Sequence, residues 1–273
     1  MIFLGCSGWS YKDWEGNFYP DPSRDKLTYY ADKFRSVEIN STFYMIPTER
    51  VVSSWVQKVR GFNGFRFSVK LPRDLSHDML LRNGEAAGHF VQSFEASVLD
   101  ILYKGGLIGA ILLQLPPFFG ARHIDNLLTL VSMVDSSKYR YAVEVRNRDL
   151  YNNSELADKL SEKSVSIVAV DSPERHIEGI SSGTNWAYVR LHGQNAQEWA
   201  NPNSQGMDRY LYSYSQAELN AIAGRIRDAE SRYTDLYVYF NNHPQGNAPR
   251  NASLLASMLG IPSSSRNRPL SDY

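Results

Sequence analysis

The feature that most constrains the fold is an alternation that repeats along almost the whole chain. Eight short runs of aliphatic and β-branched residues, typical of buried strands, alternate with stretches that have amphipathic helical spacing. The predicted strands are Ile2–Cys6, Ser36–Asn40, Phe65–Lys70, Ala110–Leu115, Tyr141–Arg146, Ser166–Asp171, Ala187–His192 and Leu236–Asn241. The predicted helices lie near residues 24–35, 48–60, 85–104, 122–134, 154–164, 215–233 and 248–259. This order indicates a parallel sheet, and eight such units close a (β/α)8 barrel.

An open, doubly wound sheet is the rival architecture for this pattern. It usually carries a Gly-rich phosphate-binding turn after its first strand, whereas residues 7–11 read Ser-Gly-Trp-Ser-Tyr. A chain of 273 residues suits one large barrel, and no Pro-rich or Gly/Ser-rich linker divides it. We therefore predict an α/β fold, a single TIM barrel over residues 1–260 with long loops at its C-terminal face, and a polar tail over 261–273.

Charge and hydropathy exclude several classes of partner. The 29 Lys and Arg residues balance the 29 Asp and Glu residues, so no overall field attracts nucleic acids or membranes. The longest apolar run, 107–113, is far shorter than the ~20 residues that a membrane span needs. The single cysteine, Cys6, can form no internal disulfide. We expect a cytoplasmic protein without a membrane partner.

Three predicted connections are longer than ordinary strand-to-helix loops, which in a barrel points to the active face. They cover residues 7–24, 70–85 and 193–215. Aromatic residues crowd the predicted loops of this face: Trp9, Tyr11, Trp14, Phe18, Tyr19, Phe43, Tyr44, Trp199, Tyr210, Tyr212 and Tyr214. Two interpretations stay open, namely a small core within the loops or a stacking wall for a sugar or a base.

Polar and aliphatic residues alternate at the ends of three predicted strands, in 37–40, 143–146 and 189–192. The aliphatic set must face the helices, because charges buried there would cost several kcal/mol each. The polar set therefore points into the barrel: Glu38, Asn40, Glu144, Arg146, Arg190 and His192. The same reasoning places a second set inward: Ser68, Lys70, Gln114, Asp171 and Asn241.

These inward positions lie near the carboxyl ends of their strands, where barrel enzymes carry their chemistry. Any single pair, such as Glu38 with Arg190, can be a structural ion pair, and Gln114 or Asn241 can be a hydrogen-bond tether. Three acids, three basic residues and a histidine at one opening would destabilise a core built only for packing. Together they indicate a functional pocket.

Seven segments resemble the signature of a known family. They are residues 5–14, 37–44, 67–72, 114–117, 143–146, 189–193 and 239–242. In kind and order they are similar to the YecE-like family, filed as a domain of unknown function (DUF72). The resemblance implies one TIM barrel of bacterial or archaeal cytoplasmic origin and no particular reaction. The chain departs from the family at Cys6, where Thr is common, and after Arg146, where the family often has His and this chain has Asn147.

The first functional hypothesis is a hydrolase-type acid/base enzyme acting on a phosphate-bearing polar substrate, such as a sugar phosphate or a phosphodiester. Glu38 and Glu144 would be the acid/base pair, and His192 would transfer a proton to the leaving group. The residues expected to bind the substrate or its anion are Lys70, Arg146, Arg190, Asn40, Asp171, Asn241, Trp9 and Tyr11. The helix start that follows Asn241 is a further place for an anion.

Other hypotheses stay open. A non-catalytic binder of single-stranded nucleic acid or oligosaccharide would use the aromatic and cationic groups, although the neutral overall charge opposes a strong grip on nucleic acid. A metal site could draw on Glu38, Glu144, Asp171 and His192, but no HxH or HExxH spacing occurs and neighbouring cations would repel a metal ion. We therefore expect no metal or other cofactor. A glycosidase needs only two carboxylates, yet the cations suit an anionic substrate better.

Overall fold

The computed structural model describes residues 1–21, 23–204 and 206–263. Within these ranges, nine parallel strands form one sheet in the order β6-β5-β4-β3-β2-β1-β9-β8-β7. The strands are β1 (Ile2–Ser7), β2 (Ser36–Ile39), β3 (Arg66–Lys70), β4 (Ile108–Gln114), β5 (Arg140–Glu144), β6 (Ser166–Ile167), β7 (Ala169–Asp171), β8 (Trp186–Leu191) and β9 (Asp235–Phe240). The predicted tail beyond residue 263 lies outside the described residues.

The sixth predicted strand is divided into β6 and β7, with only Val168 between them. β6 pairs with β5, whereas β7 pairs with β8. The Val168 N–H also donates to the Val143 carbonyl of β5 at 3.0 Å. One interrupted segment thus joins both edges of the sheet and nearly closes it into a barrel. The predicted fold class, a single α/β TIM barrel with parallel strands, is confirmed.

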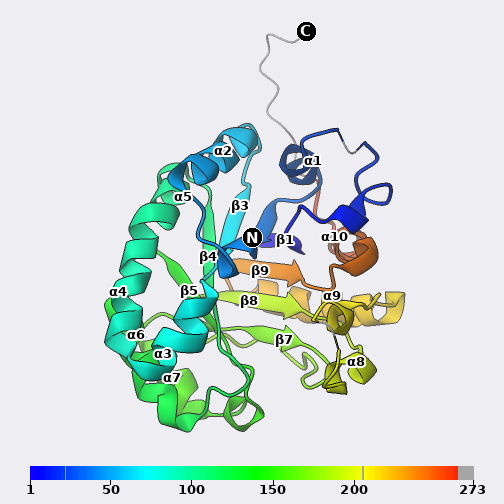
Figure 1. Cartoon of the computed structure of the whole chain (residues 1–273). Coiled ribbons are helices and arrows are strands. Elements are labelled where there is room, and N and C mark those ends of the chain that lie inside the picture. The colour runs from blue at the N-terminus through cyan, green and yellow to red at the C-terminus, as the bar shows by residue number, and fades with distance from the viewer. Residues whose placement is uncertain (22, 205, 264–273) are drawn as a thin grey trace.

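The helices lie outside the strands (Figure 1). They are α1 (Lys26–Lys33), α2 (Glu49–Val59), α3 (Leu80–Arg82), α4 (Gly84–Phe94), α5 (Asp100–Lys104), α6 (Ile124–Met133), α7 (Ser154–Glu162), α8 (Ala196–Ala200), α9 (Gln216–Glu230) and α10 (Asn247–Leu259). The helix predicted over 85–104 corresponds to α4 and α5, which are joined by a π-type turn at Glu95–Leu99. None of the helices in the described ranges is long and apolar enough to cross a membrane.

One connection differs from the sequence-based expectation, and a second agrees with it. Residues 70–85, predicted as a long loop, contain a π-type helical turn at Leu75–Met79 and then α3, because Leu75 and Leu80 bury their side chains in the core. Residues 172–185, all of them described and with no helix predicted, contain turns, bends and an isolated β-bridge between Ser172 and Arg175, so no helix separates β7 from β8. The sixth unit of this barrel therefore lacks its helix.

Two separate apolar cores pack against the outer and the inner face of the strands. The outer core, between strands and helices, contains Val37, Ile39 and Val143. A separate cluster fills the barrel interior: Phe3, Ala110, Leu112, Ala142, Val168, Val170, Trp186, Tyr188, Tyr237 and Tyr239. Inward-facing polar residues at the carboxyl ends of the strands therefore pack against this apolar cluster.

Candidate functional site

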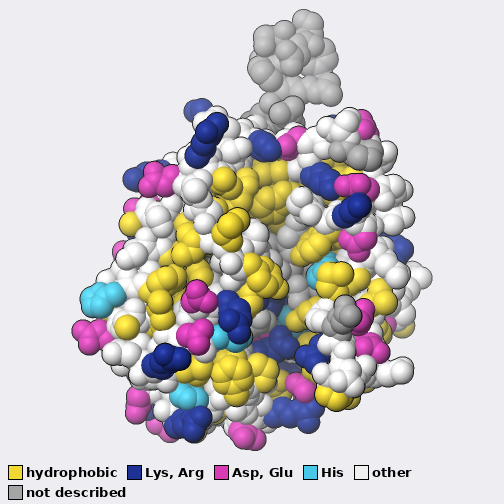
Figure 2. Space-filling model, viewed as in Figure 1, with side chains coloured by type: hydrophobic (Ala, Val, Ile, Leu, Met, Phe, Trp, Pro, Cys, Tyr) yellow, Lys and Arg dark blue, Asp and Glu magenta, His cyan; other side chains and the backbone are white. Residues whose placement is uncertain are grey.

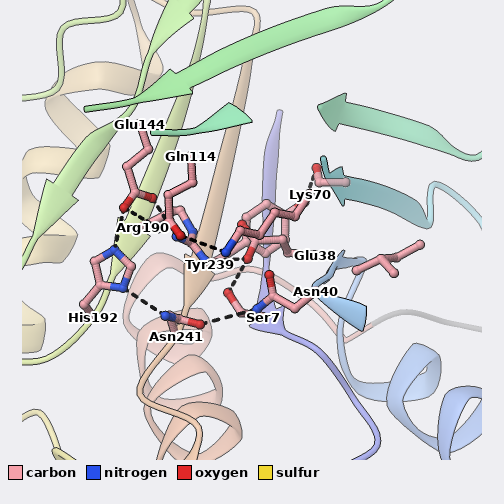
Figure 3. Close-up of polar contacts among 12 residues, drawn as sticks. Ser7, Glu38, Asn40, Lys70, Gln114, Glu144, Arg190, His192, Tyr239 and Asn241 are labelled. Atoms are coloured by element: carbon pink, nitrogen blue, oxygen red, sulfur yellow. Dashed lines mark hydrogen bonds and ion pairs between the residues drawn. The ribbon is translucent and has the colours of Figure 1, made fainter. Parts of the chain in front are cut away.

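A layer of polar side chains lies above the interior cluster, at the carboxyl ends of the strands (Figure 3). Glu38 lies on β2, Glu144 on β5 and Arg190 on β8. His192 directly follows the last residue of β8. The structure brings these four together, and none is more than 1% exposed. We call them, with Ser7, Lys70, Gln114, Arg146 and Asn241, the mouth ring.

Arg190 is the centre of the mouth ring because it bridges both carboxylates. Its Nη1 donates to Glu144 Oε2 at 2.6 Å, and its Nη2 donates to Glu38 Oε1 at 2.8 Å. Burial alone disfavours the charged form of Glu144, but Arg190 and His192 outweigh it and hold the pKa of this carboxyl well below its usual range. Arg190 is itself 1% exposed, so it holds the acids in place and does not reach the opening.

Glu38 has its oxygens occupied by three donors. Ser7 Oγ donates to Oε1 at 2.6 Å, Tyr188 OH donates to Oε2 at 2.6 Å, and Arg190 supplies the third bond. Ser7 and Tyr188 were not among the predicted site residues. The inward orientation of Tyr188 could have been predicted, since Tyr188 precedes Arg190 by two residues and so shares its inward face. Glu38 is thus a fixed anchor for Arg190.

His192 links Glu144 to the end of β9. Its Nε2 lies 3.2 Å from Glu144 Oε1, and its Nδ1 lies 3.0 Å from Asn241 Nδ2. Because an ionised carboxylate only accepts and an amide nitrogen only donates, this pattern assigns a neutral imidazole with its proton on Nε2. Burial lowers the His192 pKa to about 4 in spite of Glu144. Asn40 Nδ2, at 3.5 Å from Asn241 Oδ1, extends the chain of contacts to the segment after β2.

Lys70 ends β3 and turns its amine toward the ring. Its Nζ donates to Gln114 Oε1 at 2.8 Å, and Gln114 Nε2 donates onward to Glu144 Oε1 at 2.7 Å. Nζ also lies 3.7 Å from the centre of the Phe43 ring. Burial first, and then the positive charge of Arg190, lowers the pKa of Lys70 to about 7, although Glu144 and Glu38 oppose this.

Arg146 reaches the edge of the opening. Its Nη1 lies 3.2 Å from Glu144 Oε1, its guanidinium carbon lies 5.0 Å from the Trp199 ring, and its side chain is 16% exposed. Figure 2 shows basic side chains and histidine at the floor of a hollow in this face. Of the cations in the mouth ring, Arg146 and Lys70 are more exposed than Arg190.

The described residues of the segment 193–215 fold back over the mouth ring. Gly193 makes this turn possible with a φ of +94°, and a Cβ there would lie 2.5 Å from Tyr212 Cβ. Trp199 and Tyr210 lie against His192, with ring centres 6.0 and 5.7 Å away. The segment thereby shields the Glu144–His192 pair.

The predicted aromatic residues fall into a buried group and a partly exposed group. Trp14, Tyr19 and Tyr214 are at most 4% exposed and belong to the loop core. In contrast, Trp9 and Tyr11 are partly exposed and line a pocket of about 210 Å³ with the other residues Gly8, Ser10, Asn40, Ser41 and Tyr44. Through Asn40, this aromatic pocket adjoins the mouth ring.

The inward orientation predicted for Asp171 is wrong. Val168 and Val170 take the inward positions of this segment, so the Asp171 side chain points the other way. Its Oδ2 accepts hydrogen bonds from Tyr214 OH and Gln194 Nε2, both at 2.7 Å. The proposed metal set containing Asp171 does not converge, and the described residues include no group of three or more His, Cys, Asp or Glu that could hold a metal ion.

At the helix start after β9, one backbone donor is already occupied by the chain itself. The backbone N–H of Gln245, in the turn before α10, donates to Asp13 Oδ2 at 2.6 Å. A carboxylate of the chain itself therefore occupies the donor that the sequence suggested for a phosphate.

Comparisons with known proteins agree with the architecture. The chain is 28% identical over 277 residues to UPF0759 protein YunF of Bacillus subtilis, covering 96% of this chain and 95% of that protein. It is 29% identical over 180 residues to UPF0759 protein YecE of Escherichia coli, covering 64% of this chain and 61% of that protein.

Among solved structures, a DUF72 family protein from Thermotoga maritima superposes with a TM-score of 0.80 at 27% identity, covering 95% of this chain and 99% of that one. A DUF72 family protein from Enterococcus faecalis superposes with a TM-score of 0.82 at 24% identity, covering 98% and 99%. The family model described as "Protein of unknown function DUF72" matches residues 3–271. With its fold and its near-complete match to that model, the chain belongs to the DUF72 family.

Proposed function

We propose that the protein is an acid/base enzyme of the hydrolase type that acts on a phosphate-bearing polar substrate at the mouth ring. The observation that carries this proposal is the imbalance of charge: Lys70, Arg146 and Arg190 share only two carboxylates. Arg190 is consumed in bridging these acids, which leaves Lys70 and Arg146 to bind an anion. Inorganic phosphate and phosphate esters are anions that these two cations can bind.

Glu144 is the acid/base group in this proposal. Its Oε1 accepts from Arg146 at 3.2 Å as well as from Gln114 and His192, and a substrate phosphate that draws Arg146 away frees one of these positions and removes part of the charge that keeps Glu144 ionised. Glu144 can then take a proton from an attacking water and return it to the leaving group. Glu38 anchors Arg190. His192 stays neutral and orients Glu144, which revises the proton-donor role suggested by the sequence.

The aromatic pocket is the proposed site for the rest of the substrate. Trp9 and Tyr11 offer ring faces, and Asn40 offers a side-chain carbonyl, Oδ1, that is buried without a hydrogen-bond partner among the described residues. A sugar ring stacked there could donate a hydroxyl proton to this oxygen. The pocket of about 210 Å³ fits a small group and not a long polymer.

Paired variants of two neighbouring arginines test the anion site. Arg146→Gln removes a cation of the mouth ring, whereas Arg148→Gln removes a side chain that is 69% exposed and pairs with Glu174. By titration calorimetry, we expect Arg146→Gln to weaken inorganic phosphate binding about tenfold or more, and Arg148→Gln to change it less than about twofold. Equal effects of both variants would remove the anion site from the mouth.

Turnover is tested with the Glu144→Gln variant on p-nitrophenyl phosphate, bis-p-nitrophenyl phosphate and a panel of sugar phosphates. We expect a loss of about 10²–10⁴-fold in rate with phosphate binding retained. Circular dichroism checks that the variant is folded. Steeply salt-dependent binding of single-stranded nucleic acid, or binding of an oligosaccharide, that is indifferent to Glu144→Gln would instead support the non-catalytic binder.

A further inference from the structure

We propose that Lys70 forms an imine with the carbonyl carbon of an aldehyde or ketone substrate. This inference rests on the proposed function, because it uses the same mouth, and it narrows the substrate to phosphate-bearing carbonyl compounds. It gives Lys70 a covalent role in addition to its charge.

The partners of Lys70 set it apart from other lysines of the chain. Surface lysines such as Lys26, Lys58 and Lys159 pair with a carboxylate at 2.5–2.7 Å. Lys70 is 8% exposed, yet none of the ion pairs found among the described residues includes it. Its hydrogen-bond partner is the neutral amide of Gln114. A buried amine without a direct counter-ion favours its uncharged, nucleophilic form.

The charges that face Lys70 oppose one another, and burial is the largest influence on its protonation. Arg190 and Arg146 repel its ammonium, while Glu38 and Glu144 attract it. Glu144 is reached only through Gln114, and Glu38 is saturated by other donors. With a pKa of about 7, roughly half of the amine is uncharged at neutral pH, against less than about 0.1% for an ordinary lysine.

The side chain is also held in position for attack. Thr42 Oγ1 donates to the Lys70 carbonyl at 2.6 Å, which fixes the end of β3. Gln114 holds the amine from one side, and the Phe43 ring faces it at 3.7 Å. Figure 3 shows Nζ turned toward the centre of the mouth ring. A carbonyl carbon that enters the mouth with its phosphate at Arg146 can approach the same amine.

The step is balanced without an oxidant or a reductant. The Nζ lone pair of the neutral amine forms the C–N bond as the C=O π bond breaks, and one of the two amine protons moves to the carbonyl oxygen to give a carbinolamine. Loss of that hydroxyl as water, together with the second proton on nitrogen, leaves the C=N bond. Addition of water reverses the sequence and frees Lys70.

Reductive trapping tests the inference on the full chain. The protein is incubated near pH 7 with glyceraldehyde 3-phosphate and cyanoborohydride, whose hydride converts an imine into a stable secondary amine. Trypsin then leaves residues 67–73 uncut at Lys70, and mass spectrometry locates the adduct. We expect labelling of Lys70 to exceed that of every other lysine about tenfold or more at early times. Adducts confined to surface lysines would overturn the proposal.

Two controls separate this inference from the proposed function. Glyceraldehyde without phosphate should label Lys70 more slowly, and inorganic phosphate should compete only with the phosphorylated probe. Labelling of Lys70 that ignores phosphate supports the imine and contradicts the phosphate substrate. Phosphate binding that requires Arg146, with Lys70 left unlabelled, contradicts the imine and leaves the proposed function standing. Lys70→Arg, which keeps the charge, should lose the phosphate-dependent adduct when the mass of the intact protein is measured.

Discussion

The two ends of the barrel both carry an arginine held by carboxylate, but in opposite surroundings. At the amino ends of the strands, Arg140 binds Asp235 at 2.6 Å and Tyr237 at 2.9 Å, with 37% of its side chain exposed. At the carboxyl ends, Arg190 binds two carboxylates and is 1% exposed. Charges in water contribute little to stability, whereas buried charges are destabilising unless every partner is present. The two arginines should therefore differ in how much stability is lost when each is removed.

The lysines of the two ends differ in the same way. Near the amino ends, Lys138 forms an ion pair with Asp100 and lies beside Tyr103 and Tyr139. Near the carboxyl ends, Lys70 is buried against a neutral amide. One end satisfies its charges and the other leaves an amine without a direct counter-ion. This asymmetry is what the following experiments address.

The largest expected effect comes from removing each arginine. Arg190→Met leaves Glu38 and Glu144 buried without their shared counter-ion, and we expect a loss of about 3–5 kcal/mol in the free energy of unfolding. Arg140→Met should cost under about 1 kcal/mol, because its pair is partly exposed. Urea unfolding at pH 7 measures both. Similar losses at the two ends would break the comparison.

An intermediate effect concerns acid. The His192 pKa is about 4 in the folded protein and 6.5 for an ordinary histidine, so between these values the unfolded chain binds more protons. Protonation of His192 does not reduce the free energy of unfolding above pH 6.5. As the pH falls from 6.5 toward 4, it lowers the free energy of unfolding by about 3 kcal/mol in all.

Urea unfolding at several pH values measures this loss. His192→Gln should flatten the profile between pH 6.5 and 5, whereas His89→Gln, at a position that is 66% exposed, should leave it unchanged. An unchanged profile in His192→Gln would show that the mouth ring does not set the acid response.

The smallest expected effect is a gain in stability. Lys70→Met replaces a buried amine by an apolar side chain of similar size, and we expect about 1–3 kcal/mol of stabilisation at pH 7. The gain should shrink between pH 7 and 10.5, because the unfolded wild-type chain loses its extra proton there. Lys138→Met is the matched variant at the other end and should not stabilise. Thermal unfolding across this pH range checks both.

Much of the site could be predicted because polar and aliphatic residues alternate along its strands. In 37–40, 143–146 and 189–192 the alternation assigned Glu38, Glu144 and Arg190 to the interior, where the structure has them. Asp171 failed because residues 167–170 are all apolar, so no alternation marks the inward face, and Val168 interrupts the strand.

Other features depend on contacts between distant segments. The polar stretch 73–78 resembles a loop in the sequence, and only the burial of Leu75 and Leu80 reveals its helical turns. Glu38 was assigned to acid/base chemistry, but its saturation by Ser7 and Tyr188 depends on strands far apart along the chain. Sequence patterns give the direction of a side chain more readily than the number of partners it meets.

Because its hydrogen-bond partner is Gln114, Lys70 can change its charge without losing that contact. A carboxylate in its place would hold the Lys70 proton at all physiological pH values, whereas an amide accepts from the ammonium and from the neutral amine alike. The opening can therefore gain or lose one unit of positive charge near neutrality while its contacts persist. The ammonium form of Lys70 attracts an anionic ligand. Once Lys70 loses its proton, the lone pair of its amine faces that ligand.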